Sequence, residues 1–349
     1  MRAMDQVGYP WRIKRGSSTL ELTRPVVVAP MAGAYDPPYR MVLHQLGLEL
    51  SFTEMISARA VHEGSNRTRS ISDWVPEEGY SCAQIFGADP IYLSTAARRM
   101  ERMGHSMIDL NAGCPKRKVT GTGAGSALLR APSVFLRCIC SILDSVKVPV
   151  GTKIRSGYSE YDDNLLRVLV KDLQGAGISY IAVHPRTGKQ QYTGKVDRKL
   201  IGKVRSWVDI PILASGDVKG PEDVEQYLDL GASSVMFARG ALGDPLWFGR
   251  TLTCLNGDKE WVKDPAGGQD GLKEHLSLVR DHLENACEWY GEKRGCIEFR
   301  KHLVWYMKWF RKRGPFRERA YSINTKNDAL SLICDLETEW ARDLQMNLY

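Results

Sequence analysis

One of the cysteines, Cys114, lies at a position where its thiol could transfer a proton to a substrate. It lies just past the end of an expected strand, in the segment Asn111-Ala112-Gly113-Cys114-Pro115. A thiol titrates near 8.5 unless its surroundings shift its pKa, so at neutral pH it is mostly protonated and can act as a general acid. We expect Cys114 to be the catalytic residue.

Small and polar residues that could hold a planar, phosphorylated cofactor follow other apolar runs. Pro30-Met31-Ala32-Gly33 is a turn of small residues that lets a planar ligand approach the backbone, and Gln84 offers an amide to a ring edge. Ser215-Gly216-Asp217 and Ala238-Arg239 suit a single phosphate. FMN is the economical choice, with Lys153 stabilising its anionic reduced form. Pyridoxal phosphate is the rival, since Lys153 could form a Schiff base.

Other residues of the same set are basic or lie in a glycine-rich loop. His184 stands beside Arg186 and could donate to an oxygen of the cofactor or substrate. Lys116-Arg117-Lys118 precedes the glycine-rich segment 121–126, which matches neither a nucleotide-triphosphate loop nor a dinucleotide fold. A basic, glycine-hinged loop beside Cys114 suits a lid over a negatively charged substrate.

The elements that must position these residues recur evenly along the chain. Continuous apolar runs are typical of a parallel sheet buried on both faces, and each gap between them can hold a helix. Eight such units predict an α/β fold, a (β/α)8 TIM barrel over residues 1–255, with an open doubly wound sheet as the alternative. The runs begin near Val26, Leu50, Ser81, Met107, Val148, Tyr180, Pro211 and Ser234.

The ends of the chain depart from this pattern. Residues 10–25 predict a short hairpin that plugs the N-terminal face of the barrel. Residues 256–271 are polar and glycine-rich, which is typical of a linker. The segment 272–349 then predicts a C-terminal α-helical bundle, with helices over 272–290, 296–313 and 324–344.

Positive charge is concentrated in that last segment. The chain of 349 residues carries a net charge of +7, and residues 293–319 hold ten basic but only two acidic side chains. One strongly basic segment in an otherwise near-neutral protein indicates a polyanionic partner. Within it we favour Arg311, Lys312 and Arg313 as a phosphate-binding surface.

Several protein classes are excluded by composition. Hydrophobic residues make up 43% and charged residues 26%, as in an ordinary globular protein rather than a disordered chain. No uncharged stretch approaches the roughly 18 residues of a membrane span, and no secretory signal is recognisable, so we expect a cytoplasmic protein. The eight cysteines form no CxxC pair, so we expect neither a zinc module nor a disulfide framework, and no metal.

Together these motifs resemble the tRNA-dihydrouridine synthase family, FMN-dependent enzymes that reduce uridine in tRNA. The resemblance covers nearly the whole chain and is closest to the bacterial B-type branch and its archaeal relatives. Its most specific element is Asn111-Ala112-Gly113-Cys114-Pro115. The other motifs are Ala29-Pro30-Met31-Ala32-Gly33, Thr53-Glu54-Met55, Gln84-Ile85-Phe86-Gly87, Lys153-Ile154-Arg155-Ser156-Gly157, His184-Pro185-Arg186-Thr187, Gly216-Asp217 and Arg300-Lys301-His302.

The resemblance implies a role for each matching residue. Cys114 would donate a proton to C5 of uracil while reduced FMN delivers hydride to C6, with NADPH as the reductant. Asn111, Arg186 and Arg155 would contact the flipped base. The residues that would hold FMN are Pro30, Met31, Ala32, Gln84, Lys153, His184, Ser215, Gly216, Asp217, Ala238 and Arg239. The tRNA backbone would meet Lys116, Arg117, Lys118, Arg300, Lys301, Arg311, Lys312 and Arg313.

Some positions depart from the family pattern, and other functions stay open. Tyr35 stands where threonine is common, Ser215 where asparagine is usual, and Arg198 where tryptophan is frequent. A flavin enzyme acting on a free pyrimidine is one alternative, although it leaves the basic segment without a purpose. An RNA-binding protein without catalysis is the other. No obligate protein partner is implied, and the modified uridine is not specified.

Overall fold

The computed structural model describes residues 10–65, 71–74, 79–256, 269–310 and 313–346. The chain divides into two compact units, one made of Met1–Gly33 with Glu49–Phe237 and the other of Ala34–Leu48 with Ala238–Tyr349. Among the described residues, no helix is both long enough and apolar enough to cross a bilayer.

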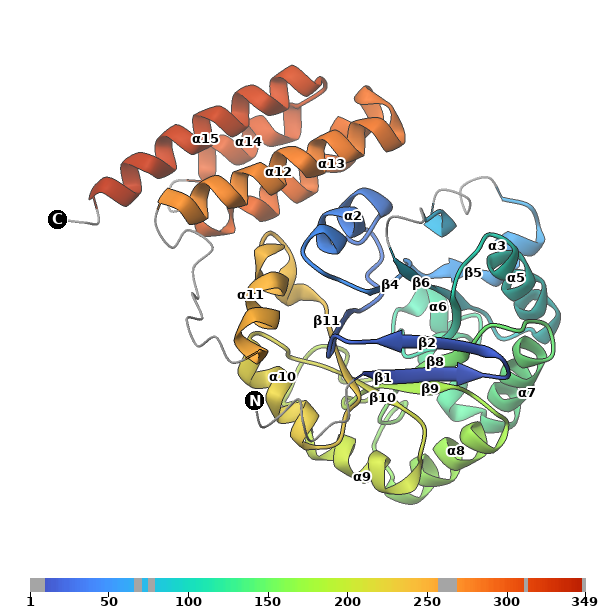
Figure 1. Cartoon of the computed structure of the whole chain (residues 1–349). Helices are drawn as coiled ribbons and strands as arrows, with labels where there is room; N and C mark the ends of the chain where they lie inside the picture. The colour runs from blue at the N-terminus through green and yellow to red at the C-terminus, as the bar shows by residue number, and fades with distance from the viewer. Residues whose placement is uncertain (1–9, 66–70, 75–78, 257–268, 311–312, 347–349) are drawn as a thin grey trace. The chain divides into compact units, whose positions relative to one another are not determined.

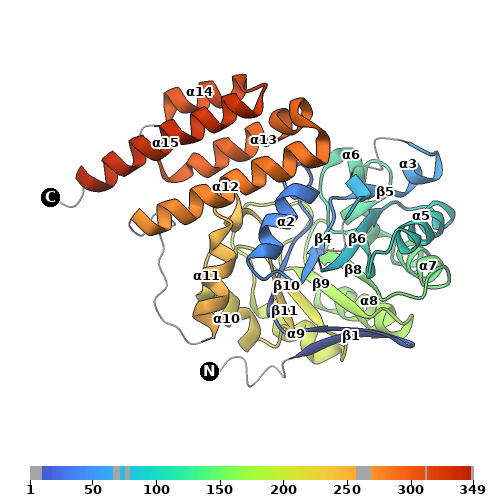
Figure 2. The same cartoon turned by 45° about the horizontal axis from the view of Figure 1, so that its top comes forward.

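The first unit is a nearly closed barrel of parallel strands (Figures 1 and 2). The last strand pairs in register with the first, Val235 with Val26 and Phe237 with Val28, which excludes the open doubly wound sheet. The predicted TIM-type barrel followed by C-terminal helices is therefore confirmed. In the order of pairing, the strands are β3 (Val26–Val28), β11 (Ser234–Phe237), β10 (Ile212–Ser215), β9 (Tyr180–His184), β8 (Val150–Arg155), β7 (Met107–Ala112), β6 (Tyr80–Phe86) and β4 (Leu50–Phe52), and the short β5 (Ile56–Ser57) also pairs with β6.

Helices follow the strands where the sequence supplies caps and prolines. Asp89 accepts hydrogen bonds from the backbone N–H groups of Ile91 and Tyr92 and so caps α5 (Pro90–Arg102). Asp162 caps α8 (Asp163–Gly175) in the same way. The remaining barrel helices are α3 (Ala58–His62), α6 (Arg117–Thr120), the 3₁₀ helix η2 (Gly125–Arg130), α7 (Pro132–Leu143), α9 (Lys199–Trp207) and α10 (Pro221–Asp229).

The predicted N-terminal hairpin is confirmed. Strands β1 (Trp11–Arg15) and β2 (Ser18–Leu22) pair antiparallel. The Arg15 guanidinium donates to the carbonyls of Val146 and Val148, directly before β8 begins. The hairpin is therefore fastened at the N-terminal ends of the strands, the end of the barrel opposite the expected site.

The second unit is helical and includes one segment from early in the chain. Val42 of α2 (Pro37–Gln45) packs with Leu246 of α11 (Leu246–Leu255) and Leu278 of α12 (Gln269–Tyr290). The other helices are η3 (Arg239–Ala241), α13 (Glu292–Tyr306), η4 (Met307–Trp309), α14 (Gly314–Ser322) and α15 (Lys326–Met346). The compact units divide the chain at Gly33, Leu48 and Phe237, and α2 packs against α12; the boundary after residue 255 stays a prediction. Most of the predicted linker, 257–268, lies outside the described residues.

Candidate active site

The loop after β7 holds Cys114 by backbone contacts. The Asn111 side-chain oxygen accepts hydrogen bonds from the backbone N–H groups of Gly113 at 3.2 Å and Cys114 at 2.9 Å. Arg155 Nε donates to the Gly113 carbonyl at 2.7 Å. The Cys114 carbonyl accepts from Ser126 N at 3.0 Å. The thiol is therefore carried on a loop whose geometry is fixed on both sides.

The Cys114 thiol is partly exposed, and its surroundings keep it protonated. Burial raises its pKa above the ordinary value, and this effect exceeds the opposing influence of the Lys116 backbone N–H and of the Arg155, Lys116 and Lys153 cations. A protonated thiol can donate a proton but is a poor nucleophile. The site therefore suits general-acid chemistry.

A buried polar network lies beside this loop, and sequence reasoning missed half of it. Gln84 Nε2 donates to Asp109 Oδ2 at 2.8 Å, and its Oε1 accepts from Asn111 Nδ2 at 2.7 Å. The Tyr180 hydroxyl donates to Asp109 Oδ1 at 2.8 Å. Burial raises the pKa of Asp109 to about 6, against the influence of these hydrogen bonds and of Lys153. A carboxylate two residues before Asn111, inside a fully buried strand, was the signal that could have identified it.

Lys153 of β8 reaches past the end of β9 to Ser215 at the end of β10. Its Nζ lies 3.1 Å from Ser215 Oγ. Burial lowers the pKa of Lys153 to about 8, and repulsion from Arg155 adds to this. A desolvated ammonium favours an anionic ligand. The neighbouring Gly216 has φ +120°, and a Cβ there would lie 2.9 Å from the His184 ring, so the backbone packs directly on that ring.

The two predicted substrate-binding arginines are tied to the protein. Arg155 is 2% exposed and also donates to the carbonyls of Thr187 and Gln191 at 2.8 and 2.7 Å. Arg186 forms a bidentate pair with Asp217 at 2.9 and 2.5 Å. In this structure both therefore hold the rim loops together, and their contacts with a substrate remain predictions.

The remaining cofactor residues lie at two strand ends. Pro30 and Met31 are half-buried and Ala32 is exposed in the turn after β3. That turn is fastened by a hydrogen bond from Gly33 N to Glu54 Oε1 at 2.8 Å. Ala238 and Arg239 follow β11 directly in the chain and belong to the second unit, so their part in the site stays a prediction.

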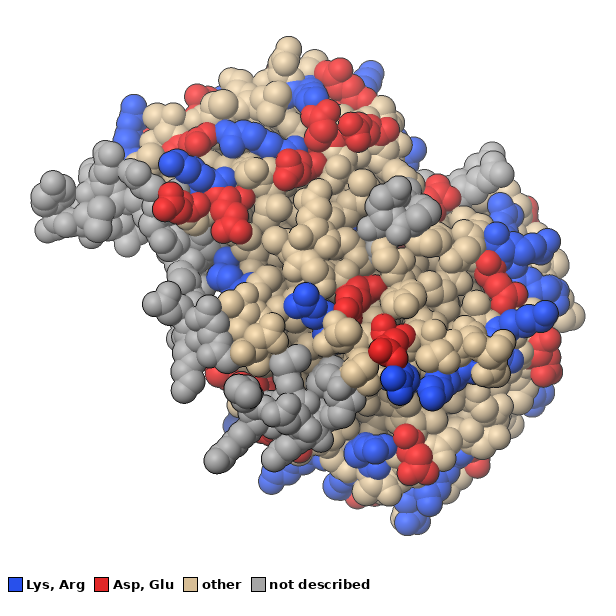
Figure 3. All heavy atoms as spheres, viewed as in Figure 1, with Lys and Arg blue, Asp and Glu red and all other residues tan. Residues whose placement is uncertain are grey.

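The residues predicted to contact tRNA differ in their exposure and in the partners that they already have. Lys116, Arg117 and Lys118 are all exposed, beside Cys114 in the chain. Arg300 is used within the helical unit, where it donates to Asn324 and the Ile323 carbonyl, and Lys301 pairs with Glu298 at 3.1 Å. Arg313 is exposed, while Arg311 and Lys312 lie outside the described residues. On the face in Figure 3, basic and acidic side chains are interspersed over the C-terminal helices.

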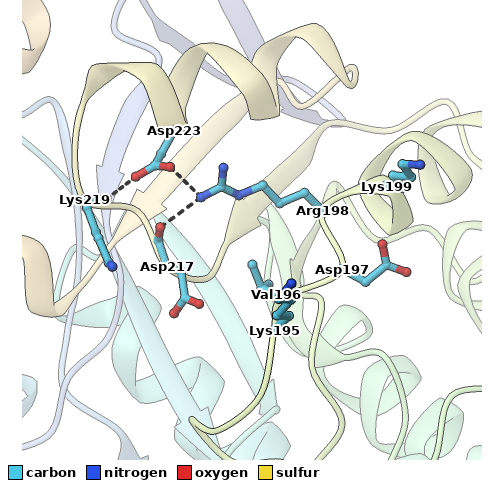
Figure 4. Close-up of a pocket in the computed structure, with 8 residues that line it drawn as sticks. All are labelled: Lys195, Val196, Asp197, Arg198, Lys199, Asp217, Lys219 and Asp223. Carbon is cyan, nitrogen blue, oxygen red and sulfur yellow. Dashed lines mark hydrogen bonds and ion pairs between the residues drawn. The ribbon is translucent and has the colours of Figure 1, made fainter.

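A pocket of about 510 Å³ opens between the loops that follow β9 and β10 (Figure 4). Arg198 lies at its centre and donates to Asp223 at 2.5 Å and to the Asp217 carbonyl at 3.1 Å. Arg198 therefore joins the two loops that line the pocket. Its other charged lining residues are Lys195, Asp197, Lys199 and Lys219.

Comparison with known proteins places the chain in a family. The model of the dihydrouridine synthase family matches residues 27–341. The tRNA-dihydrouridine synthase B of Pasteurella multocida is 31% identical over 89% of this chain and 92% of its own length. That of Xanthomonas axonopodis pv. citri is 34% identical with the same coverage. Morphinone reductase has a similar fold, with a TM-score of 0.50 and 14% identity over 70% of this chain and 89% of its own. The chain belongs to the dihydrouridine synthase family.

Proposed function

We propose that this protein reduces the C5=C6 bond of specific uridines in tRNA, using FMN and NADPH. The observation that carries the proposal is the protonated Cys114 thiol on a fixed loop at the carboxyl ends of the strands, in a chain of the dihydrouridine synthase family. The protein would act in the cytoplasm, on tRNA made there.

The barrel residues fit a flavin phosphate and ring. Lys153 supplies a half-buried cation, Ser215 a hydroxyl, and Gly216 a backbone that packs against His184. Gln84 of β6 is buried with its amide bound to Asp109 and Asn111, so it would meet the flavin by exchanging one of these partners. We propose that these residues hold FMN together with Pro30, Met31, Ala32 and Asp217, while Ala238 and Arg239 stay predicted contributors. When bound and reduced, FMN supplies the hydride for C6 of uracil.

The chain's own residues then orient the base and move one proton. Cys114 Sγ holds the proton that C5 receives, and the raised pKa keeps that proton in place until the base enters. The target uridine must leave its stack to reach the thiol. Asn111 and Arg186 meet the base by exchanging their present partners, Gln84 and Asp217, for its carbonyl oxygens.

The test is a reaction with an unmodified tRNA transcript and NADPH, followed by mass spectrometry for dihydrouridine. We expect a yellow protein, dihydrouridine in the transcript, and RNA binding that weakens steeply with salt. Reduction of free uracil but not of tRNA would identify a small-molecule enzyme instead. RNA binding by a colourless, inactive protein would identify a binding module.

A further inference from the structure

The helical unit contains a buried cluster of one carboxylate and two imidazoles. Asp36 caps the N-terminus of α2, while His282 lies on α12 and His302 on α13. One ligand atom from each residue lies within 4.8 Å of the other two, and His302 Nε2 is 3.8 Å from Asp36 Oδ1. The three residues are 8%, 1% and 2% exposed.

Two nitrogen atoms of this cluster have no hydrogen-bond partner. Nε2 of His282 and Nε2 of His302 are both buried and unpaired. A buried polar atom without a partner costs about 1–3 kcal/mol, so such atoms are rare and call for an explanation. An imidazole titrates near 6.5, so at neutral pH most rings are neutral and the unprotonated nitrogen carries a free lone pair. A neutral imidazole is the form that binds a metal ion.

The groups around the cluster orient it as the outer shell of a metal site does. The Tyr306 hydroxyl lies 2.9 Å from His282 Nδ1, and a proton on Nδ1 leaves the lone pair on Nε2. The Tyr290 hydroxyl donates to Asp36 Oδ2 at 3.2 Å and leaves Oδ1 toward His302. The Tyr39 ring stacks on His302 with centroids 5.2 Å apart.

The nearby cations have other partners. Lys301 and Arg40 are the positive groups that act on the Asp36 carboxylate. Lys301 pairs with Glu298 at 3.1 Å, and Arg40 donates to the Tyr35 carbonyl at 3.0 Å. Burial raises the pKa of Asp36, and both cations oppose that rise.

We propose that Asp36, His282 and His302 bind one Zn²⁺ ion that ties α2 to α12 and α13. Two imidazole nitrogens and one carboxylate oxygen form a ligand set that Zn²⁺ accepts, with a fourth position for water. Bonds of about 2.0–2.2 Å in a tetrahedron place ligand atoms roughly 3.3–3.6 Å apart. The cluster therefore closes by no more than about 1.5 Å when the ion enters. The chain gives little sequence signal for this site, because Asp36 is far from both histidines along it.

The experiment measures zinc per chain by mass spectrometry after loading the full-length protein with Zn²⁺ and dialysing it. We expect one ion per chain in the wild type. His282→Gln and His302→Gln should each weaken zinc binding by more than the roughly 10–100-fold that loss of an outer-shell partner costs. His275→Gln is the matched control, because His275 is also a buried histidine of α12 but lies against Trp340, outside the cluster. That variant should keep the ion.

A further variant tests the proposal if the histidine variants fail to fold. Asp36→Asn keeps a side-chain oxygen to cap α2 at Tyr39 N but removes the carboxylate. It should fold, and lose zinc and the rise in thermal midpoint that zinc gives the wild type. A wild type that retains no zinc would overturn the proposal and leave only the 3.8 Å contact between Asp36 and His302. Zinc retained in both histidine variants would overturn it too, and would point to Cys287 and Cys296, whose sulfurs are 3.8 Å apart.

Discussion

At the scale of single residues, a variant of Cys114 tests proton donation separately from cofactor binding. Cys114→Ala removes the thiol but none of the side chains proposed to hold FMN. We expect bound flavin to be unchanged and dihydrouridine formation to fall about 10²–10⁴-fold, the usual contribution of a general acid. The measurement is single-turnover reduction of tRNA by the prereduced protein. Cys140→Ala, at an exposed cysteine of α7, is the control and should react like the wild type.

Lys153 makes a prediction about pH. Its pKa is lowered to about 8, so the ammonium loses its proton, and its attraction for an anionic cofactor, as pH rises through that value. We expect the dissociation constant for FMN to be lowest near pH 7 and to rise by at most about tenfold per pH unit above 8. Flavin fluorescence titrations from pH 7 to 9 measure it. Lys153→Met should bind FMN weakly at every pH, and the same pH step in that variant would assign the titration to another group.

At the scale of elements, the loop that carries Cys114 depends on one glycine. Gly125 has φ +60°, and a Cβ there would lie 2.6 Å from the Cys114 carbonyl. Gly125→Ala therefore adds both backbone strain, about 1–3 kcal/mol, and a steric clash that displaces the thiol. We expect a lower rate of tRNA reduction and a lower thermal midpoint.

Gly123→Ala supplies the control for that change. Gly123 also has positive φ, +80°, but the nearest atom to its Cβ would be Ala88 Cβ at 3.5 Å. This variant should lose stability through strain alone and keep most of its rate. Equal losses of rate in the two variants would show that the clash with Cys114 is not what matters.

The basic loop makes a prediction about RNA. Lys116, Arg117 and Lys118 are exposed beside Cys114, and each phosphate contact contributes about 0.7–0.9 to the slope of log K against log salt. Replacing all three with Ala should weaken tRNA binding and flatten that slope by up to about 2–3 units. Replacing the exposed Arg98, Arg167 and Lys171 removes the same charge from barrel helices and should flatten it less. Equal changes of slope in the two variants would mean that tRNA binding depends only on the net charge of the protein.

Strands and helices were predictable where the local sequence pattern determines them. Every predicted strand begins within two residues of its observed position, because a strand buried on both faces needs a continuous apolar run. Helix α14 was missed, since it is short and only Ala320 is buried within it. The roles of the site residues stay predictions, and the contacts among these residues were not predictable from the sequence. Asp109 on β7 and Tyr180 on β9 meet because both strands pair with β8, and Arg186 meets Asp217 because β9 pairs with β10.

At the scale of the whole molecule, buried titratable groups decide how stability depends on pH. Burial lowers the pKa of His275 to about 4, whereas an unfolded histidine titrates near 6.5. Below pH 6.5 the unfolded chain binds a proton that the folded chain does not, so this residue makes stability fall as pH falls from about 7 to 4. The slope is at most about 1.4 kcal/mol per pH unit. His44, with its pKa lowered to about 4 by burial, acts in the same direction.

Asp109 changes stability with pH in the opposite direction to His275, so variants of the two residues test the assignment together. Its pKa is raised to about 6, so between about pH 6 and 4 the folded chain holds a proton that the unfolded chain has lost, and stability gains as pH falls. Urea unfolding at pH 7, 6 and 5 should therefore show a shallower acid loss in His275→Gln and a steeper one in Asp109→Asn. Slopes that change in the same sense in both variants would contradict the assignment, because the two groups exchange protons with opposite sign.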